Sequence, residues 1–323
     1  MKEIDRDKQA IDFDDEIDLR ELFFILVQGK RMVAYVTAFL VIIGIIYSLY
    51  LPNIYQSEAL LAPVDESSSL IGEALSQYSG LAGLAGINLP TGETGSNSKK
   101  AIELMNSLNF FEKYIMPKIF LPDLMAVDSW DDEKNIIIYD DSIFQKDTNT
   151  WVRDFSYPQK LIPSAQESFE IFKNDNLSVL EDNKTKYVSL SIKHQSPVIA
   201  KEWVQIIFEE VNFFYRQKDK ESSEKAVIFL NKQIADNSYS EIRQATASLL
   251  KKEIQKLTLV EANKDYVFEY VYPPSVMEEK IMPNRYIIVF LSLLLGVFLG
   301  VIVVIFRHYL FLSRKNEVEK IVS

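Results

Sequence analysis

The stretch Tyr272–Gly300 reads YPPSVMEEKIMPNRYIIVFLSLLLGVFLG, in which prolines and charged residues run directly into a long apolar block. This block extends over the 21 residues of Tyr286–Phe306, and a similar block occupies the 20 residues of Met32–Leu51. Neither block contains a charged side chain. Because a helix rises about 1.5 Å per residue, each block spans roughly 30 Å, the thickness of a bilayer core. The sequence therefore predicts two transmembrane helices that flank one large central segment.

Basic residues close to the two blocks predict the orientation of the chain in the membrane. Those that precede the first block or follow the second are Lys30, Arg31, Arg307, Arg314 and Lys315. On the other side, Arg285 stands beside the second block and Lys280 lies a little further away. Since cytoplasmic flanks carry the excess of lysine and arginine, both termini are predicted to be cytoplasmic. The first block is too long and starts too late for a cleaved signal peptide, so we expect a retained anchor.

The composition argues against several functional classes. The chain has no cysteine, so its external domain needs no disulfides, and its net charge of −11 argues against nucleic acid as a partner. Of the two histidines, His194 is expected to be structural and His308 to anchor the chain at the membrane surface. No zinc-ligand spacing, nucleophile elbow or phosphate-binding loop is present in the sequence. We therefore predict no catalytic residue, no cofactor and no metal site.

A long helical hairpin is predicted in the second half of the central segment. Ser196 can cap a helix and Pro197 suits its first position, and neither proline nor glycine follows until Pro273. An apolar stripe then recurs at helical spacing: Trp203, Ile207, Val211 and Phe214. A turn is expected at Asp236–Ser240, before a second helix at Glu241–Ala262. Such long arms cannot bury their apolar faces alone, so the pattern favours oligomerisation.

The rest of the central segment predicts an α/β base. Strands are expected at Tyr55–Pro63, Asn135–Tyr139, Thr185–Lys193 and Tyr266–Tyr272, helices at Ala101–Lys118 and Ser164–Lys173, and a linker at Thr91–Ser98. The fold class is thus an α+β membrane protein. Its segments are a tail at 1–31, a span at 32–51, the base at 52–195, the hairpin at 196–263, a last strand with a proline strut at 264–285, a span at 286–306 and a tail at 307–323.

Three sets of residues are candidates for special roles. Pro273 and Pro274 end a strand and Pro283 fixes the backbone before the second span, which predicts a stiff strut; the alternative is a loop that prolines merely punctuate. Gly296 and Gly300 form a GxxxG motif that permits close helix packing, although such motifs also occur by chance. An uncharged loop is expected either to remain an ordinary loop or to pack against a neighbour or a pore, through Leu81, Leu84 and Ile87.

The order of these segments resembles the Wzz-type polysaccharide co-polymerases, the chain-length determinants of Gram-negative bacteria. The resemblance is carried by DEIDLREL at Asp15–Leu22 and by LPNIYQSEALLAP, LSQYSGLAGLAGINL, HQSPVIAKEWVQ and LVEANKDYVFEYVYPPSVMEEKIMPNR further along the chain. The second span has fewer glycines than is usual in the family, with only Gly296 and Gly300, and the predicted hairpin is shorter than in enterobacterial members. Because of these two departures, the resemblance does not specify the length of the polysaccharide.

The resemblance implies a non-enzymatic regulator of O-antigen-like polysaccharide length in the bacterial inner membrane, with most of the protein in the periplasm. It also implies a ring of several copies that works with a Wzy-type polymerase, and a lipid-linked glycan is a further candidate partner. The aromatic side chains that could contact a glycan are Trp203, Phe213, Phe214 and Tyr215, and the alternative for most of them is core packing. Two other functions remain open from the sequence: a two-span periplasmic sensor and a periplasmic adaptor of an export pump.

Overall fold

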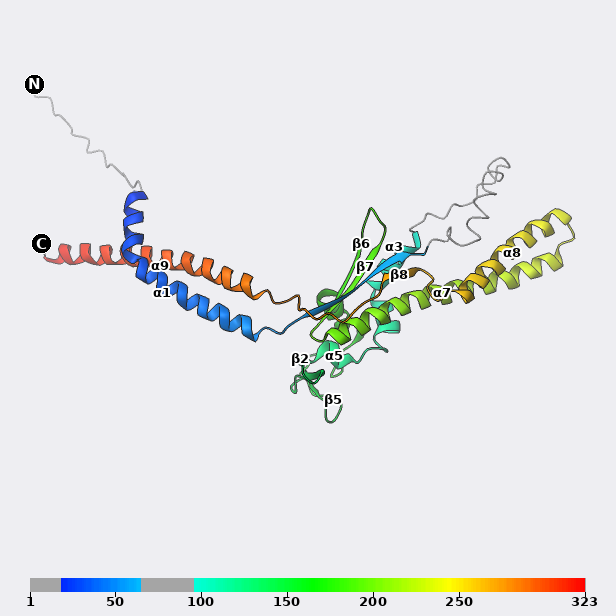
Figure 1. Cartoon of the computed structure of the whole chain (residues 1–323), viewed down its shortest axis with the longest axis horizontal. Coiled ribbons are helices and arrows are strands. Elements are labelled where there is room, and N and C mark those ends of the chain that lie inside the picture. Colours follow the sequence, from blue (N-terminus) through cyan, green and yellow to red (C-terminus); the bar gives the residue numbers. More distant parts are fainter. Residues whose placement is uncertain (1–18, 65–95, 323) are drawn as a thin grey trace, which may run out of the picture. The chain divides into compact units, whose positions relative to one another are not determined.

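The computed structural model describes residues 19–64 and 96–322, which form two compact units (Figure 1). One unit combines the chain up to Pro52 with the chain from Pro283 onward, and the other consists of Asn53–Met282. The predicted loop residues Leu81, Leu84 and Ile87 lie outside the described residues.

The first unit consists of two long helices, α1 at Leu19–Tyr50 and α9 at Arg285–Val322. Within them, Phe24–Tyr50 and Arg285–His308 are long and apolar enough to cross a membrane. The two helices pack along each other, yet large apolar side chains such as Phe39 and Phe298 remain exposed. Such side chains are costly in water and favourable in lipid, so the prediction of two apolar helices near the ends is confirmed.

The second unit is built on a four-stranded antiparallel sheet with the order β6-β7-β1-β8. Its strands are β1 at Tyr55–Pro63, β6 at Leu177–Glu181, β7 at Val188–His194 and β8 at Phe268–Tyr272. The first and last strands of the chain lie side by side, with Ala62 opposite Glu269. The sequence predicted that these two strands belong to one sheet. It did not predict β6, because the five residues of this strand lie close behind a predicted helix and lack a distinct alternation of apolar and polar side chains.

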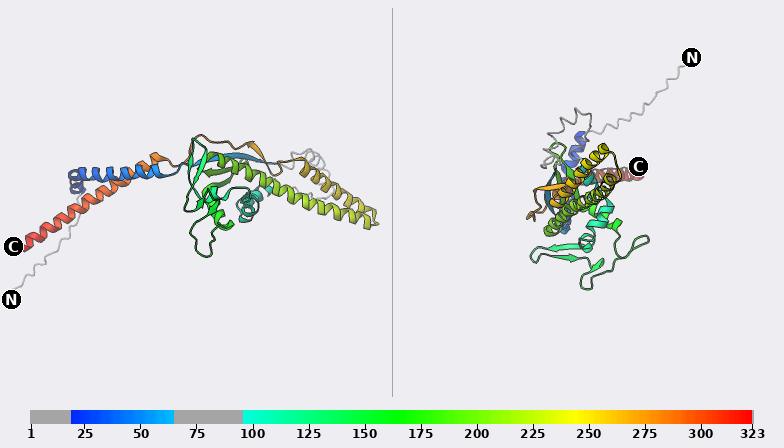
Figure 2. Two further views of the ribbon diagram at one scale, coloured as in Figure 1. Left: turned by 90° about the horizontal axis from the view of Figure 1, so that it is seen from below. Right: turned by 90° about the vertical axis from the view of Figure 1, so that its right-hand side faces the viewer.

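The hairpin consists of α7 at Pro197–Asp236 and α8 at Ser240–Ala262. The Ser196 hydroxyl accepts a bond from the backbone N–H of Ile199, and Pro197 occupies the first turn, which confirms the predicted start of the helix. The first part of α7 covers one face of the sheet, and α8 packs along its second part (Figures 1 and 2). The mixed α/β unit with its long helical hairpin confirms the predicted fold class.

The hydrophobic core lies between α7 and the sheet and continues under the short helices. The sheet contributes Ala59, Leu61, Val188, Leu190 and Ile192, and α7 contributes Ala200, Trp203, Val204, Ile207 and Val211. Three phenylalanines at most 1% exposed, Phe110, Phe111 and Phe172, close the core on the side of the short helices. Apolar side chains alternate along the strands because successive residues point to opposite faces, and only one face is covered by α7.

Short helices surround the core: α3 at Ser96–Met105, α4 at Leu108–Phe110, η1 at Phe111–Ile115, α5 at Leu121–Met125, α6 at Ala165–Ile171 and η2 at Phe172–Asn176. The single helix predicted at Ala101–Lys118 is wrong, because the chain breaks between α3 and α4. The Asn106 side chain bonds back to the carbonyl of Ile102, and the Ser107 hydroxyl caps the next helix. The predicted linker at Thr91–Ser98 is also wrong in part, since α3 already begins at Ser96.

Two small hairpins complete the second unit. Strand β2 at Val127–Asp131 pairs with β3 at Ile136–Tyr139, and β4 at Phe144–Gln145 pairs with β5 at Thr150–Trp151. The strand predicted at Asn135–Tyr139 therefore exists but lies outside the main sheet.

Candidate functional site

The proline segment after β8 does not run free but is bonded along β1. We call residues 275–282 the strap. The Ser57 hydroxyl donates to the carbonyl of Ser275 at 2.8 Å, and the N–H of Ile54 donates to the carbonyl of Met282 at 3.0 Å. At the same end, the Lys280 ammonium donates to the side-chain oxygen of Asn53 at 2.7 Å. The strap therefore continues the edge of the sheet antiparallel to β1 after β8 has ended.

The three predicted strut prolines lie at both ends of the strap. Pro273 and Pro274 directly follow β8, where Pro273 is exposed and neither proline can donate a ladder hydrogen bond. Pro283 comes after the strap and is the first residue of the returning part of the helical unit. The sequence located these residues, but the hydrogen bonds that hold the strap carry no sequence signature. Their mechanical role stays a prediction.

The GxxxG glycines of α9 face α1 of the same chain. A Cβ atom added to Gly296 would lie 2.8 Å from the Cα of Thr37, and one added to Gly300 would lie 3.0 Å from the Cα of Val33. Both obstacles are backbone atoms, so a larger residue would have to push the helices apart. Two further glycines, Gly29 and Gly44 of α1, make similarly close approaches to α9. The spacing of these two matches no motif, which is why sequence inspection missed them.

A buried histidine links three elements of the second unit. The Nδ1 atom of His194 accepts a bond from the N–H of Ser196 at 2.9 Å, and Nε2 lies 2.8 Å from the carbonyl of Asp123. Nε2 therefore carries the proton of the neutral ring. The His194 ring also contacts the Trp203 ring edge-on, with the two ring centroids 5.1 Å apart. Burial lowers the pKa of His194, which favours this neutral form and confirms its predicted structural role.

A buried asparagine holds the hairpin against the last strand. The Oδ1 atom of Asn212 accepts bonds from the backbone N–H groups of Tyr266, Val267 and Phe268 at 2.8–3.1 Å. Its Nδ2 atom donates to the carbonyl of Phe268 at 3.0 Å. Nearby, the Tyr266 hydroxyl donates to Asp219, which also pairs with Lys256 of α8. We call Asn212 with residues 266–268 the clasp, because it joins the middle of α7 to the chain that enters β8.

The predicted glycan-facing aromatic residues are divided by burial. Trp203 and Tyr215 are buried in the core, so the suggestion that they contact a glycan is wrong for these two in this structure. Phe214 packs partly buried against the core, while Phe213 is exposed. The charged run Arg216–Lys225 is a mostly solvated face with ion pairs such as Lys220–Glu261 and Lys225–Glu221.

Metal binding has no support among residues 19–64 and 96–322, which contain no group of three or more His, Cys, Asp or Glu side chains placed to hold an ion. The notable features of the described chain are structural: a bonded strap, a close-packed helix pair, a clasp and a long hairpin. Together they describe a chain with two apolar helices that are long enough to cross a membrane and a unit of mixed α/β architecture.

Comparison with known proteins gives a more particular assignment. The family model of the chain length determinant proteins, Wzz, matches residues 15–116. The resemblance to this family is confirmed over residues 15–116. No curated protein matches the chain.

Several solved structures are similar to the chain at low identity. A full-length bacterial polysaccharide co-polymerase is 13% identical, with 91% of this chain and 98% of that chain covered and a TM-score of 0.40. A fragment of WzzB, a polysaccharide co-polymerase from Salmonella Typhimurium, is 14% identical, with coverages of 71% and 100% and a TM-score of 0.30. A point mutant of the Shigella flexneri lipopolysaccharide O-antigen chain-length regulator WzzB is 11% identical, with coverages of 70% and 99% and a TM-score of 0.23.

Proposed function

We propose that this chain regulates the length of an O-antigen-like surface polysaccharide without catalysing a reaction itself. The observation that carries the proposal is the match of residues 15–116 to the chain length determinant family model. The matched residues run from α1 through β1 to η1, and so join the first apolar helix to a central strand of the sheet. A scaffold anchored by two apolar helices suits a regulator that positions other molecules at a membrane.

In this proposal the chain crosses the bacterial inner membrane twice, with residues 52–285 in the periplasm and both termini in the cytoplasm. The excess of basic residues at the outer ends of the two apolar blocks supports this orientation. The periplasmic part divides into a base at 52–195, a hairpin at 196–263 and the last strand with its strut at 264–285.

Several copies stand side by side as a ring in this proposal, beside a Wzy-type polymerase and its lipid-linked glycan. The hairpin supports assembly, because α7 and α8 together leave large apolar side chains uncovered: Ile228, Phe229, Ile242 and Leu249. A solvated hairpin with such a surface gains free energy when a second hairpin covers it.

The candidate site residues act on the geometry of this assembly. Pro273, Pro274 and Pro283 limit the conformations of the chain around the strap, while Gly296 and Gly300 hold α9 close to α1. The loop that contains Leu81, Leu84 and Ile87 packs against a protein surface within the assembly. We expect Pro283→Ala and Gly296→Leu to shift the polysaccharide length distribution; unchanged ladders with both variants would contradict these roles.

The deciding experiment is a gel of surface polysaccharide from a strain that lacks the gene and is complemented with it. Complementation should restore a preferred length, whereas the deletion strain should show a distribution without that maximum. An identical ladder in both strains would disprove the proposed function. The detergent-solubilised mass is an independent test, since a ring of several copies is expected and a monomer or dimer would favour a sensor.

A further inference from the structure

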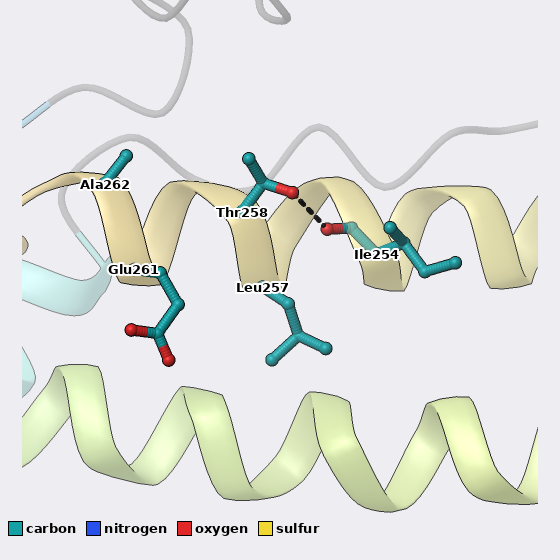
Figure 3. A pocket seen from close by; sticks show the side chains of 5 residues that line it. All are labelled: Ile254, Leu257, Thr258, Glu261 and Ala262. Atoms are coloured by element: carbon teal, nitrogen blue, oxygen red, sulfur yellow. Dashed lines mark hydrogen bonds between the residues drawn. The ribbon is translucent and has the colours of Figure 1, made fainter.

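Helix α8 carries an uncharged stripe on the side turned away from α7. Figure 3 shows Thr258 and Ala262 on this side and Leu257 and Glu261 pointing toward α7, with the Ile254 side chain between the two sides at the edge of the stripe. These five residues line a shallow hollow of about 520 Å³. Ile254 is 49% exposed, and Thr258 and Ala262 are exposed as well. The stripe residues recur every four positions and so lie above one another along roughly 12 Å of helix.

The stripe is more apolar than its residue types suggest. The Thr258 hydroxyl donates to the carbonyl of Ile254 at 2.9 Å, so its hydrogen is used within the helix and its methyl group remains available for contact. Charged residues flank the stripe along the helix: Lys251, Lys252, Glu253, Lys256 and Glu261. Among the described elements, α7 is the one that packs extensively along α8, and it does so on the opposite side.

We propose that this stripe is the docking surface for residues 78–90 of the same chain. These residues read YSGLAGLAGINLP, and none of them is charged. Leu81, Leu84 and Ile87 are spaced by three, with alanines and glycines between them that leave room for close approach to a helix. Uncharged residues of this kind can pack on the uncharged stripe, whereas they cannot form ion pairs with the charged residues beside it.

The ends of the connecting chain lie where docking requires them. The N–H of Val64 donates to the carbonyl of Val267 at 2.9 Å, only five residues after α8 ends at Ala262. At the other end, α3 begins at Ser96 and packs on α7 through its buried Ala101. The 31 residues in between can extend by about 3.3 Å each, which is far more than the length of the stripe. The chain can therefore reach the stripe from both of its ends.

Tethering favours this occupant over a separate molecule. A segment linked to its site by a chain of this length acts at an effective concentration on the order of millimolar. Weak apolar contacts then suffice for docking, whereas a free partner would need a larger interface to compete. The inference does not depend on the proposed function, because docking can be tested without a polysaccharide.

The absence of cysteine from the natural chain gives a clean crosslinking test. Leu81→Cys, Leu84→Cys and Ile87→Cys are each combined with Thr258→Cys in the full-length protein, which is then oxidised under mild conditions. A disulfide requires Cα atoms within about 7 Å. The matched control replaces Thr258→Cys by Lys252→Cys, another exposed position that lies roughly 120° around the helix.

Docking predicts a disulfide within one chain for at least one Thr258 pair, identified by mass spectrometry, and at least about a tenfold lower yield with Lys252. A disulfide between two chains would overturn the proposal and identify a neighbouring copy as the occupant. Equal yields at both positions, or no disulfide while the thiols react with maleimide after denaturation, would also overturn it.

Hydrogen exchange gives a second measurement that does not depend on the chosen pairs. The variant Ile254→Asp places a charge in the exposed stripe and should leave the fold intact, because the side chain has no role in the core. If residues 78–90 dock on α8, their amides should exchange about tenfold faster in this variant than in the natural protein. Equal rates in the two proteins would refute docking, and Lys252→Asp serves as the control.

Discussion

The two halves of α7 carry apolar residues at helical spacing, but only the half that crosses the sheet buries them. Trp203, Ile207 and Val211 are at most 2% exposed, whereas Ile228 and Phe229 are 71% and 59% exposed. The difference lies in what each half meets, because the first half covers a sheet and the second meets one helix, α8. A single helix cannot cover an apolar face that extends around its neighbour. The first half is therefore part of a core, and the second half is an exposed surface available for assembly.

The clasp marks the boundary between these two halves, and its loss should have the largest effect. In Asn212→Leu, three backbone N–H groups, two of them buried, lose their acceptor at once, which should lower the free energy of unfolding by at least about 3 kcal/mol. Urea unfolding of the full chain in detergent, followed by tryptophan fluorescence, would measure this. All three tryptophans, Trp130, Trp151 and Trp203, lie in the second unit and report on it alone.

The matched control is Asn237→Leu in the turn of the hairpin. The side chain of Asn237 bonds only to Gln233, one turn earlier in the same helix, so its loss should cost less than about 1 kcal/mol. Similar losses at both positions would show that the clasp is no stronger than a local helix cap.

The clasp also shows what the sequence could not reveal. Asn212 lies between Val211 and Phe213, where a polar residue is normally taken for the solvated side of a helix. Its partners lie 54–56 residues further along the chain, and no local pattern encodes such a bond. The hairpin itself was predictable, because Ser196, Pro197 and the long absence of proline and glycine are local signals.

The same limit applies to the strap and the helix pair. The prolines and the GxxxG motif could be found by inspection, since each depends on residue type and spacing alone. The residues that contact Ser275 of the strap and Gly296, which are Ser57 and Thr37, could not be found, because a serine in a strand and a threonine in an apolar block have many ordinary roles. Strand β6 and the break at Ser107 were missed for a related reason: short elements carry too few residues for a periodic signal.

A pair of truncations would test the two halves of α7 directly. Ile207→Ala removes buried methyl groups and should lower the free energy of unfolding by about 2–5 kcal/mol, while Ile228→Ala should change it by less than about 0.5 kcal/mol. The mass of the detergent-solubilised protein should depend on the other position. Ile228→Asp should lower the number of copies in the oligomer, and Ile207→Ala should leave that number unchanged in mild conditions. If Ile228→Asp leaves the oligomer intact, the second half of α7 is not part of the assembly surface.

The smallest expected effect is a pH dependence that belongs only to the buried half. His194 caps the region where α7 begins, and burial holds its pKa below the ordinary value of about 6.5. The unfolded chain therefore binds more protons than the folded chain as the pH falls below about 7, so this residue should destabilise the fold progressively toward acid. The neighbouring Asp123 contributes with the opposite sign, because burial raises the pKa of its carboxyl group and favours the protonated folded form.

The two contributions can be separated by comparing His194→Gln with the natural protein at each pH. The Gln side chain can still donate a hydrogen bond but does not titrate, so the stability difference between the two proteins should shrink from pH 7.5 to about pH 5. Hydrogen exchange should place this loss at residues 123 and 194–199, where the ring bonds to Asp123 and Ser196, and not in α8. A difference that stays constant with pH would mean that His194 remains neutral in the unfolded chain or becomes charged equally well in the core. If protection is also lost over the rest of the hairpin, the stability of the second half of α7 depends on the packing of the first half.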